Sequence, residues 1–174
     1  MEFDEQASRC RSLFISKNKD YGTAWRILRP SSITDQILIK ALRIRSIEEK
    51  GTQQIGDSIA SEFTGIINYC IMGLIQLQYW PQPEKEFNDL ELINLYDNEL
   101  SETKALMVQK NHDYGEAWRE MRASSFTDLI LMKLNRTKQI EDNNGKTLVS
   151  EGIDANYRDM INYAIFALIT LNTK

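Results

Sequence analysis

The chain has 174 residues, of which 42% are apolar and 26% are charged, and its formal net charge is −4. This length allows one well-buried core or two small units that share one, and the composition is that of an ordinary globular domain. The negative balance excludes a general electrostatic attraction to nucleic-acid polymers or anionic membranes. The acidic N-terminus lacks the apolar stretch of a secretory signal, and Cys10 and Cys70 lack metal-ligand spacing, so we expect a cytoplasmic protein with free thiols.

The first predicted helix spans roughly residues 4–17, and a counterpart spans 88–110. In the counterpart, apolar residues follow the spacing of one helical face: Leu92, Leu95, Tyr96 and Leu100. Each helix is expected to end at an asparagine, Asn18 or Asn111, because this residue adopts the left-handed C-cap conformation readily.

The segment that begins at Asn18 returns 93 residues later, at Asn111. Of the 31 positions from 18 to 48, 18 are identical to their counterparts in 111–141. After a one-residue shift the match continues through the end of each half, with Asn68-Tyr69 answering Asn162-Tyr163. The chain is therefore predicted to be a tandem duplication.

Two more helices are expected in each half. The second starts near Ser31-Ser32 or Ser124-Ser125, which are favourable N-cap residues, and runs to about residue 50 or 143, where glycine stops it. The third spans about 57–79 or 150–172. It is apolar, but asparagine and glutamine interrupt it, which favours a buried core helix over a membrane span.

These elements predict an all-α protein in which two three-helix units pack as a pseudo-dimeric bundle. Pro81-Gln-Pro83 breaks the chain between them. We expect a first repeat at 1–80, a linker at 81–86 and a second repeat at 87–174, forming one compact domain overall. The apolar third helices also make a homodimer reasonable.

A basic pair occurs in both halves on the second helix, as Lys40 with Arg43 and as Lys133 with Arg136. Each pair lies along the apolar stripe of its helix, where cations need partners when they lose water. Facing carboxylates would make them a structural ion-pair lattice between helices, whereas a bound ligand's phosphates would make them a binding site. Both alternatives stay open at this point.

Three acids occur on the third helix of the second half, namely Glu151, Asp154 and Asp159. Carboxylates on one broad helix face can hold Mg²⁺ and leave room for phosphates, although a solvated acidic face is the commoner arrangement. In the first half Asp57, Ala60 and Gly65 occupy these places, and Glu62 is an additional carboxylate.

The run Asp-Tyr-Gly-x-Ala-Trp-Arg is the most similar part of the two halves. Its aromatic residues either close the core or stack on a flat ring such as a base. Its aspartate either caps a helix, pairs with a lysine or arginine, or contacts a ligand. The single histidine, His112, corresponds to Lys19 when the two halves are aligned, and it is expected to be a surface residue. The loop supplies these candidate nucleotide-binding residues: Asp20, Tyr21, Trp25, Asp113, Tyr114 and Trp118.

These motifs together resemble the nucleotide-modification-associated domain family, over nearly the whole chain. The Asp159-x-x-Asn162-Tyr163 signature is complete only in the second half. That family is similar in turn to MazG-type all-α pyrophosphohydrolases, which use carboxylate-held Mg²⁺ to cleave between the α- and β-phosphates of nucleotides. The resemblance gives Glu151-x-x-Asp154 the role of one acidic pair, but Lys133-x-x-Arg136 stands where a second is expected, and Asp128 and Glu141 are the remaining carboxylates.

The sequence therefore predicts a nucleotide-binding protein, with Mg²⁺- or Mn²⁺-dependent pyrophosphohydrolase-like activity as the leading hypothesis. The metal would be held in the second half by Glu151, Asp154 and Asp159, and Tyr114 or Trp118 would stack on the base. Phosphates would contact three cations of the second half, Lys133, Arg136 and Lys110. The corresponding phosphate-binding candidates of the first half are Lys40 and Arg43. The alternatives are a non-catalytic nucleotide-binding or interaction module, favoured by the basic pair, and a purely structural scaffold.

Overall fold

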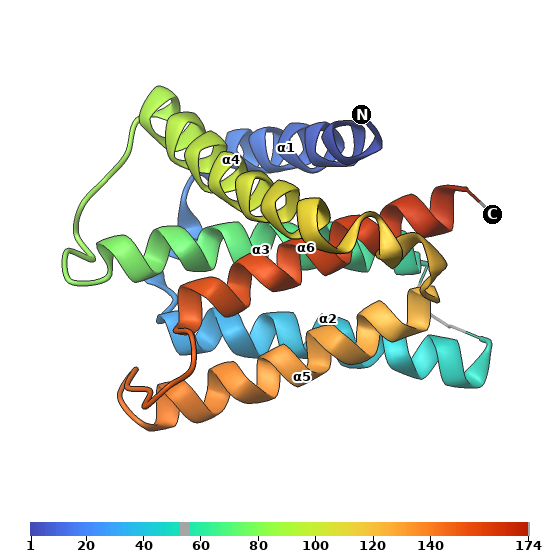
Figure 1. Cartoon of the computed structure of the whole chain (residues 1–174). Helices are drawn as coiled ribbons and strands as arrows, with labels where there is room; N and C mark the ends of the chain where they lie inside the picture. Colours follow the sequence, from blue (N-terminus) through green and yellow to red (C-terminus); the bar gives the residue numbers. More distant parts are fainter. Residues whose placement is uncertain (53–55, 174) are drawn as a thin grey trace.

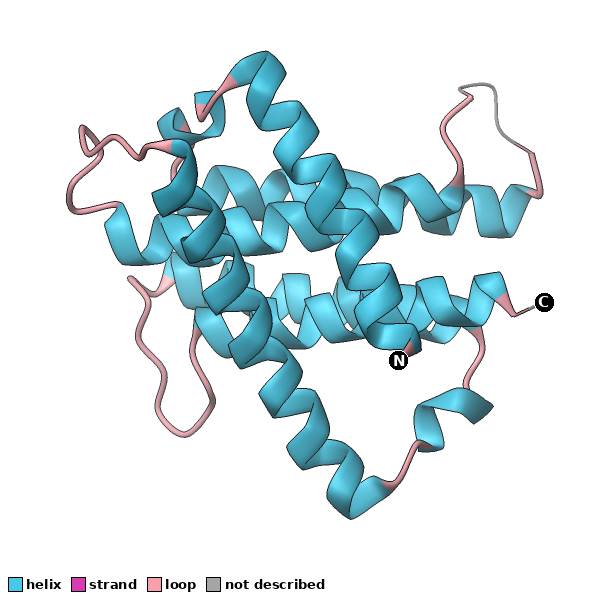
Figure 2. Ribbon diagram, turned by 90° about the horizontal axis from the view of Figure 1, so that it is seen from above, coloured by secondary structure: helices cyan, strands magenta, loops and turns pink. Residues whose placement is uncertain are grey.

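The computed structural model describes residues 1–52 and 56–173, and this part of the chain contains helices and no strands (Figures 1 and 2). The prediction of an all-α fold is confirmed. The first unit contains α1 (Glu2–Tyr21), the short 3₁₀ helix η1 (Ala24–Ile27), α2 (Pro30–Lys50) and α3 (Ile59–Tyr79). The second repeats this order with α4 (Asp89–Tyr114), η2 (Ala117–Glu120), α5 (Ala123–Asp142) and α6 (Ile153–Asn172).

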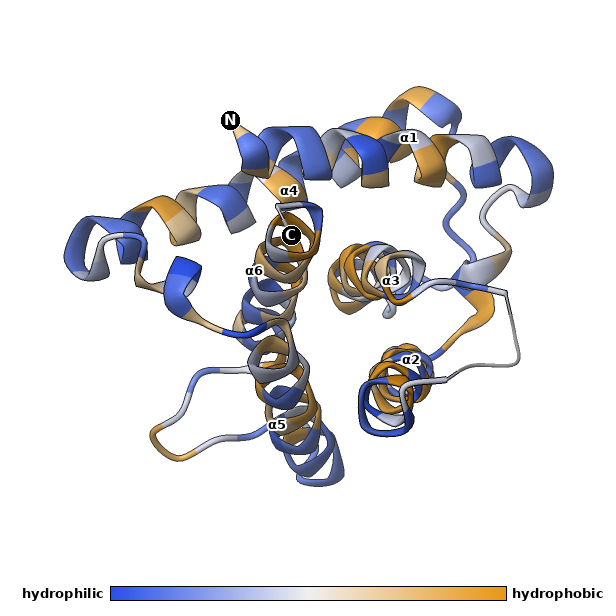
Figure 3. Ribbon diagram, turned by 90° about the vertical axis from the view of Figure 1, so that its right-hand side faces the viewer, coloured by the Kyte–Doolittle hydropathy of each residue, from blue (hydrophilic) through white to orange (hydrophobic). Residues whose placement is uncertain are grey.

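The six long helices form three layers. The apolar third helices of the two units, α3 and α6, lie side by side in the middle, with α1 and α4 across one side and α2 and α5 on the other (Figures 1 and 3). The buried apolar residues of both units belong to one continuous core. The third helices thus bury their apolar faces within the chain. Association of two chains stays a prediction.

Reciprocal contacts relate the two units as the subunits of a dimer are related. Thr34 Oγ1 donates to Glu141 at 2.8 Å, and its counterpart Thr127 Oγ1 donates to Glu48 at 3.2 Å. In the outer layer Arg11 pairs with Asp97 at 2.7 Å, and Lys104, the counterpart of Arg11, pairs with Asp4 at 2.7 Å. When residue i contacts j′ and i′ contacts j, the interface is self-complementary, as across a twofold axis.

Several helix ends differ from the predicted ones. The first helix of each unit continues one turn past Asn18 or Asn111, because Gly22 and Gly115 supply positive φ values of 60° and 62° at the true ends. The predicted serine caps are wrong, since α2 and α5 begin directly after Arg29 and Arg122.

The third helices also start later than predicted, at Ile59 and Ile153. Ser58 caps α3 by accepting a hydrogen bond from the Ser61 N–H at 3.0 Å. Glu151 consequently lies in the connection before α6 and not on the helix.

Buried asparagines hold the outer helices against the central layer. Asn68 Nδ2 donates to the Cys10 carbonyl at 3.1 Å, and its counterpart Asn162 donates to the Thr103 carbonyl at 3.3 Å. This explains why both copies keep this asparagine. None of the described helices combines the length and apolarity that crossing a bilayer requires.

Candidate functional site

The first unit contains a cavity of about 560 Å³ between α1, η1 and α3, which we call the α1–α3 cavity. The Asp-Tyr-Gly turn contributes Tyr21 and Gly22 to its lining, because α1 ends at that turn and η1 follows at once. Many of the motif residues shared by the two units line this cavity, together with Lys17 from α1: Asn18, Tyr21, Gly22, Trp25, Lys40, Asn68 and Tyr69.

Two lysines and two acids give the α1–α3 cavity its charge. Lys17 is exposed on α1, and Lys40 enters from α2 with 27% of its side chain exposed. Lys40 Nζ lies 3.5 Å from Glu62 and 5.8 Å from the centre of the Tyr69 ring. The second acid, Asp57, comes from the connection before α3. The cavity therefore combines cations with aromatic surface.

Gly65 makes room for Lys40. A Cβ atom at position 65 would lie 2.9 Å from Lys40 Cε, so the aliphatic part of the lysine runs directly over the glycine. Arg43, one turn along α2, contacts Glu62 at 3.2 Å and donates to the backbone carbonyl of Asp57 at 2.8 Å. In the first unit the basic pair thus meets a carboxylate of α3.

In the second unit Asp159, the counterpart of Gly65, pairs with two lysines. Lys133 and Lys110 each place Nζ 2.8 Å from a different oxygen of Asp159. Lys133 is only 9% exposed and Asp159 only 4%. Burial lowers the pKa of Lys110, but the hydrogen bond and charge of Asp159 outweigh burial and leave that pKa above its ordinary value.

The two units thus carry their buried acid one helical turn apart. Glu62 in the first unit corresponds to Asn156 in the second, whereas Gly65 corresponds to Asp159. Each acid meets the repeated lysine of the second helix, Lys40 or Lys133. Of the two alternatives for the basic pair, the structure shows the interhelical ion pair for both lysines and for Arg43.

The three acids predicted to hold magnesium are not gathered into a site. Both oxygens of Asp159 are taken by lysines, while Asp154 and Glu151 are exposed near the start of α6. Within residues 1–52 and 56–173, no three side chains of the metal-binding types cluster. These residues, as arranged, do not fit a bound Mg²⁺ ion.

Two further carboxylates considered for that site lie elsewhere. Glu141 accepts a hydrogen bond from Thr34 across the unit interface. Asp128 is mostly exposed, and its nearest cation is Arg45 at 3.9 Å.

The repeated aromatic residues differ between the units. Tyr21 and Trp25 line the α1–α3 cavity. Trp118 stacks on Phe166 with ring centres 4.2 Å apart, and the guanidinium of Arg119 lies over the Trp118 ring, 4.4 Å from its centre. These neighbours favour a packing role for Trp118 over stacking on a base.

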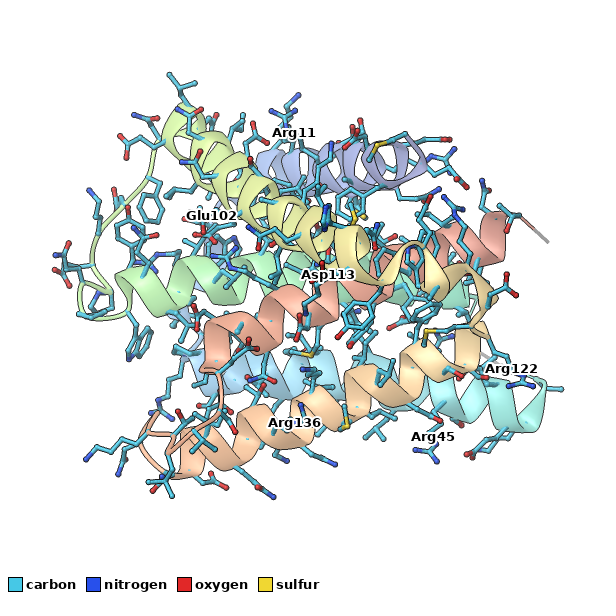
Figure 4. All side chains as sticks on the ribbon, in the orientation of Figure 1. Arg11, Arg45, Glu102, Asp113, Arg122 and Arg136 are labelled. Carbon is cyan, nitrogen blue, oxygen red and sulfur yellow. The ribbon has the colours of Figure 1, made fainter. Side chains whose placement is uncertain are left out.

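The remaining candidates from the turns are at the surface. Asp20, Asp113 and Tyr114 are exposed at the ends of α1 and α4, and His112 lies 3.1 Å from Asp113. Figure 4 shows Asp113 and Arg136 on different helices. Arg136 is exposed on α5 and lines an open cavity of about 700 Å³ beneath the α5–α6 connection, together with Lys133, Lys146 and Glu151.

Lys17, Asn18 and Tyr69 line the α1–α3 cavity but were missing from the predicted site. Asn18 Oδ1 is buried without a hydrogen-bond partner in the described structure, so it is available to accept from a ligand. Repetition was the signal that would have found them, because all three recur as Lys110, Asn111 and Tyr163.

Comparison with known proteins gives a result at the family level. No curated protein and no solved structure matches the chain significantly. The profile of the family described as nucleotide modification associated domain 1 matches twice, over residues 17–77 and 110–171. These segments include the Asp-Tyr-Gly turns, the basic pairs and most of the third helices, and together they cover more than half of the chain. The chain therefore belongs to the nucleotide modification associated domain 1 family, as a tandem duplication of its domain.

Proposed function

We propose that the protein binds a nucleotide in the α1–α3 cavity of its first unit. The observation that carries this proposal is that one cavity collects Lys17 and Lys40 beside the aromatic rings of Tyr21, Trp25 and Tyr69. Lysines suit the phosphates, and aromatic rings suit the base. A volume of about 560 Å³ is within the range of small-molecule sites.

The first unit suits a ligand better than the second, which reverses the expectation from the sequence. In the second unit, Lys110 and Lys133 are already paired with Asp159, and the half-buried Trp118 is stacked on Phe166. In the first unit Lys17 has no ion-pair partner among the described residues, and Lys40 holds its carboxylate at the longer distance of 3.5 Å. A phosphate that binds in the first unit would therefore disrupt weaker ion pairs than one that binds in the second unit.

Isothermal titration of the common nucleoside mono- and triphosphates tests the proposal. We expect one site per chain, and we expect Lys17→Ala to weaken it by roughly tenfold, the usual effect of losing one charged hydrogen bond. Lys19→Ala is the matched control, because Lys19 is an exposed lysine of the same helix that does not line the cavity. The proposal would be refuted if none of the nucleotides binds, or if Lys17→Ala and Lys19→Ala have equal effects.

The second candidate is a Mg²⁺-dependent pyrophosphohydrolase. It is favoured by one observation, that the carboxylates of Asp57 and Glu62 line the same cavity as the two lysines. Both oxygens of Glu62 contact cations, Lys40 and Arg43, which a metal ion would have to displace. A bound Mg²⁺ ion would neutralise phosphate charge and supply an activated water. Pyrophosphate release from nucleoside triphosphates, measured with Mg²⁺, with Mn²⁺ and with chelator, separates the two functions. Turnover that Glu62→Gln abolishes supports the enzyme, whereas binding without turnover supports the binding module.

A further inference from the structure

We infer that the Asp159 carboxylate of the second unit occupies the place that a ligand's phosphate takes in the first unit. The inference rests on the proposed function and deepens it, because it assigns an anion subsite to Lys17 and Lys40, above Gly65. It also explains why a chain with two copies of the domain would have one ligand site.

The repeat supplies the geometry. Lys110 and Lys133 of the second unit correspond to Lys17 and Lys40 of the first. Lys110 and Lys133 converge on the carboxylate of Asp159, with 2.8 Å contacts to its two oxygens. In the first unit the equivalent lysines line a single cavity, and the position equivalent to Asp159 is a glycine without a side chain. The first unit therefore keeps both cations and lacks a carboxylate at this position.

Charge supports the same assignment. Asp159 is buried and its carboxylate has two charged donors, which is the arrangement that a buried anion requires. In the first unit Glu62 is the nearest acid to Lys40, but it lies one turn earlier on α3 and also contacts Arg43 at 3.2 Å. Arg43 shares the charge of Glu62, so Lys40 remains able to bind a second anion.

The ligand class follows from the subsite. Two lysines that line one cavity suit a compact anion with several equivalent oxygens, such as a phosphoryl group. Asn18 Oδ1, buried and lacking a partner in the described residues, accepts a hydrogen bond from a donor group elsewhere on the same ligand. A phosphorylated compound with a hydroxyl or amino group meets both requirements, and a nucleotide is one.

Exchanging the two residues tests the inference, with inorganic pyrophosphate as the probe in isothermal titration. We expect one site in the wild-type protein, about 10- to 100-fold weaker binding in Gly65→Asp, and a second site in Asp159→Gly. Gly65→Asn is the matched control, because it adds the same volume without charge. Any side chain at position 65 must displace Lys40, so Gly65→Asn should also weaken binding, and the further loss in Gly65→Asp measures the effect of the charge.

The outcomes separate this inference from the proposed function. Equal losses in Gly65→Asp and Gly65→Asn, or a single site in Asp159→Gly, would overturn the anion subsite and leave nucleotide binding in place. No binding of pyrophosphate by the wild-type protein would overturn the subsite of Lys17 and Lys40 even if Asp159→Gly binds it, whereas the nucleotide titration decides the function proposed for the first unit. If Asp159→Gly does not fold, the comparison at position 65 still decides the question.

Discussion

Lys40 and Lys133 are the same residue of the repeat in two different environments. Lys133 is almost fully buried and lies 2.8 Å from Asp159, whereas 27% of the Lys40 side chain is exposed and the lysine lies 3.5 Å from Glu62. Removing Lys133 leaves the buried Asp159 with Lys110 as its one cationic partner and one oxygen without a charged donor, whereas a partly exposed pair such as that of Lys40 contributes little. The two positions therefore form a natural matched pair.

We expect Lys133→Met to lower the free energy of unfolding by about 2–4 kcal/mol and Lys40→Met by less than about 1 kcal/mol. Methionine keeps most of the lysine's length and removes its charge. Urea denaturation followed by circular dichroism measures both values. Equal losses at the two positions would contradict the difference in burial on which the prediction depends.

Some of this site could be predicted from single residues. The repeat pointed to the lysines of the second helices, and Glu62 stood out as a carboxylate without a counterpart. From the sequence, Gly65 indicates only the loss of an acid, because a sequence does not show that the Lys40 side chain runs over it. The same limit applies to Asp159, since its two lysines come from different helices, α4 and α5.

At the scale of the elements, the turn after α1 and its copy after α4 depend on glycine. Gly22 has φ 60° with ψ −142°, and Gly115 has φ 62° with ψ −151°. Residues with a Cβ atom avoid this region, in which even asparagine is unfavourable. The sequence predicted the turns but placed the helix ends at Asn18 and Asn111, because the glycine that ends each helix also belongs to the motif that follows.

We predict that Gly22→Ala destabilises the protein by about 1–3 kcal/mol through backbone strain, since nothing lies within 4 Å of the added Cβ atom. Gly56→Ala is the control, because it also adds a Cβ atom in open space but does not require a positive φ. Thermal melts of both variants measure the difference. A Gly22→Ala protein as stable as Gly56→Ala would show that the turn tolerates a side chain.

At the scale of the whole molecule, the two units meet along α2 and α5 through a repeated threonine–glutamate contact. Thr34 donates to Glu141, and Thr127 donates to Glu48. Burial raises the pKa of both glutamates above the ordinary value of 4.5, against the lowering effect of the threonine hydroxyls. The duplication predicted that the units pack together, but these pairs depend on the way α2 crosses α5, which no local pattern specifies.

A raised pKa means that the folded state binds the proton more tightly than the unfolded state. The contribution of each glutamate to stability is therefore full below pH 4.5 and is lost as the pH rises through the higher pKa of the folded state. We expect the Glu48→Gln/Glu141→Gln double variant to gain stability relative to wild type over this interval, by about 1 kcal/mol at pH 7. Glutamine still accepts the threonine hydrogen bond and carries no charge that burial penalises. Denaturation at pH 4 and pH 7 checks this, and the exposed Glu49→Gln is the control, since its side chain is 67% exposed. A gain at pH 4 as large as that at pH 7 would mean that titration at the unit interface does not affect folding.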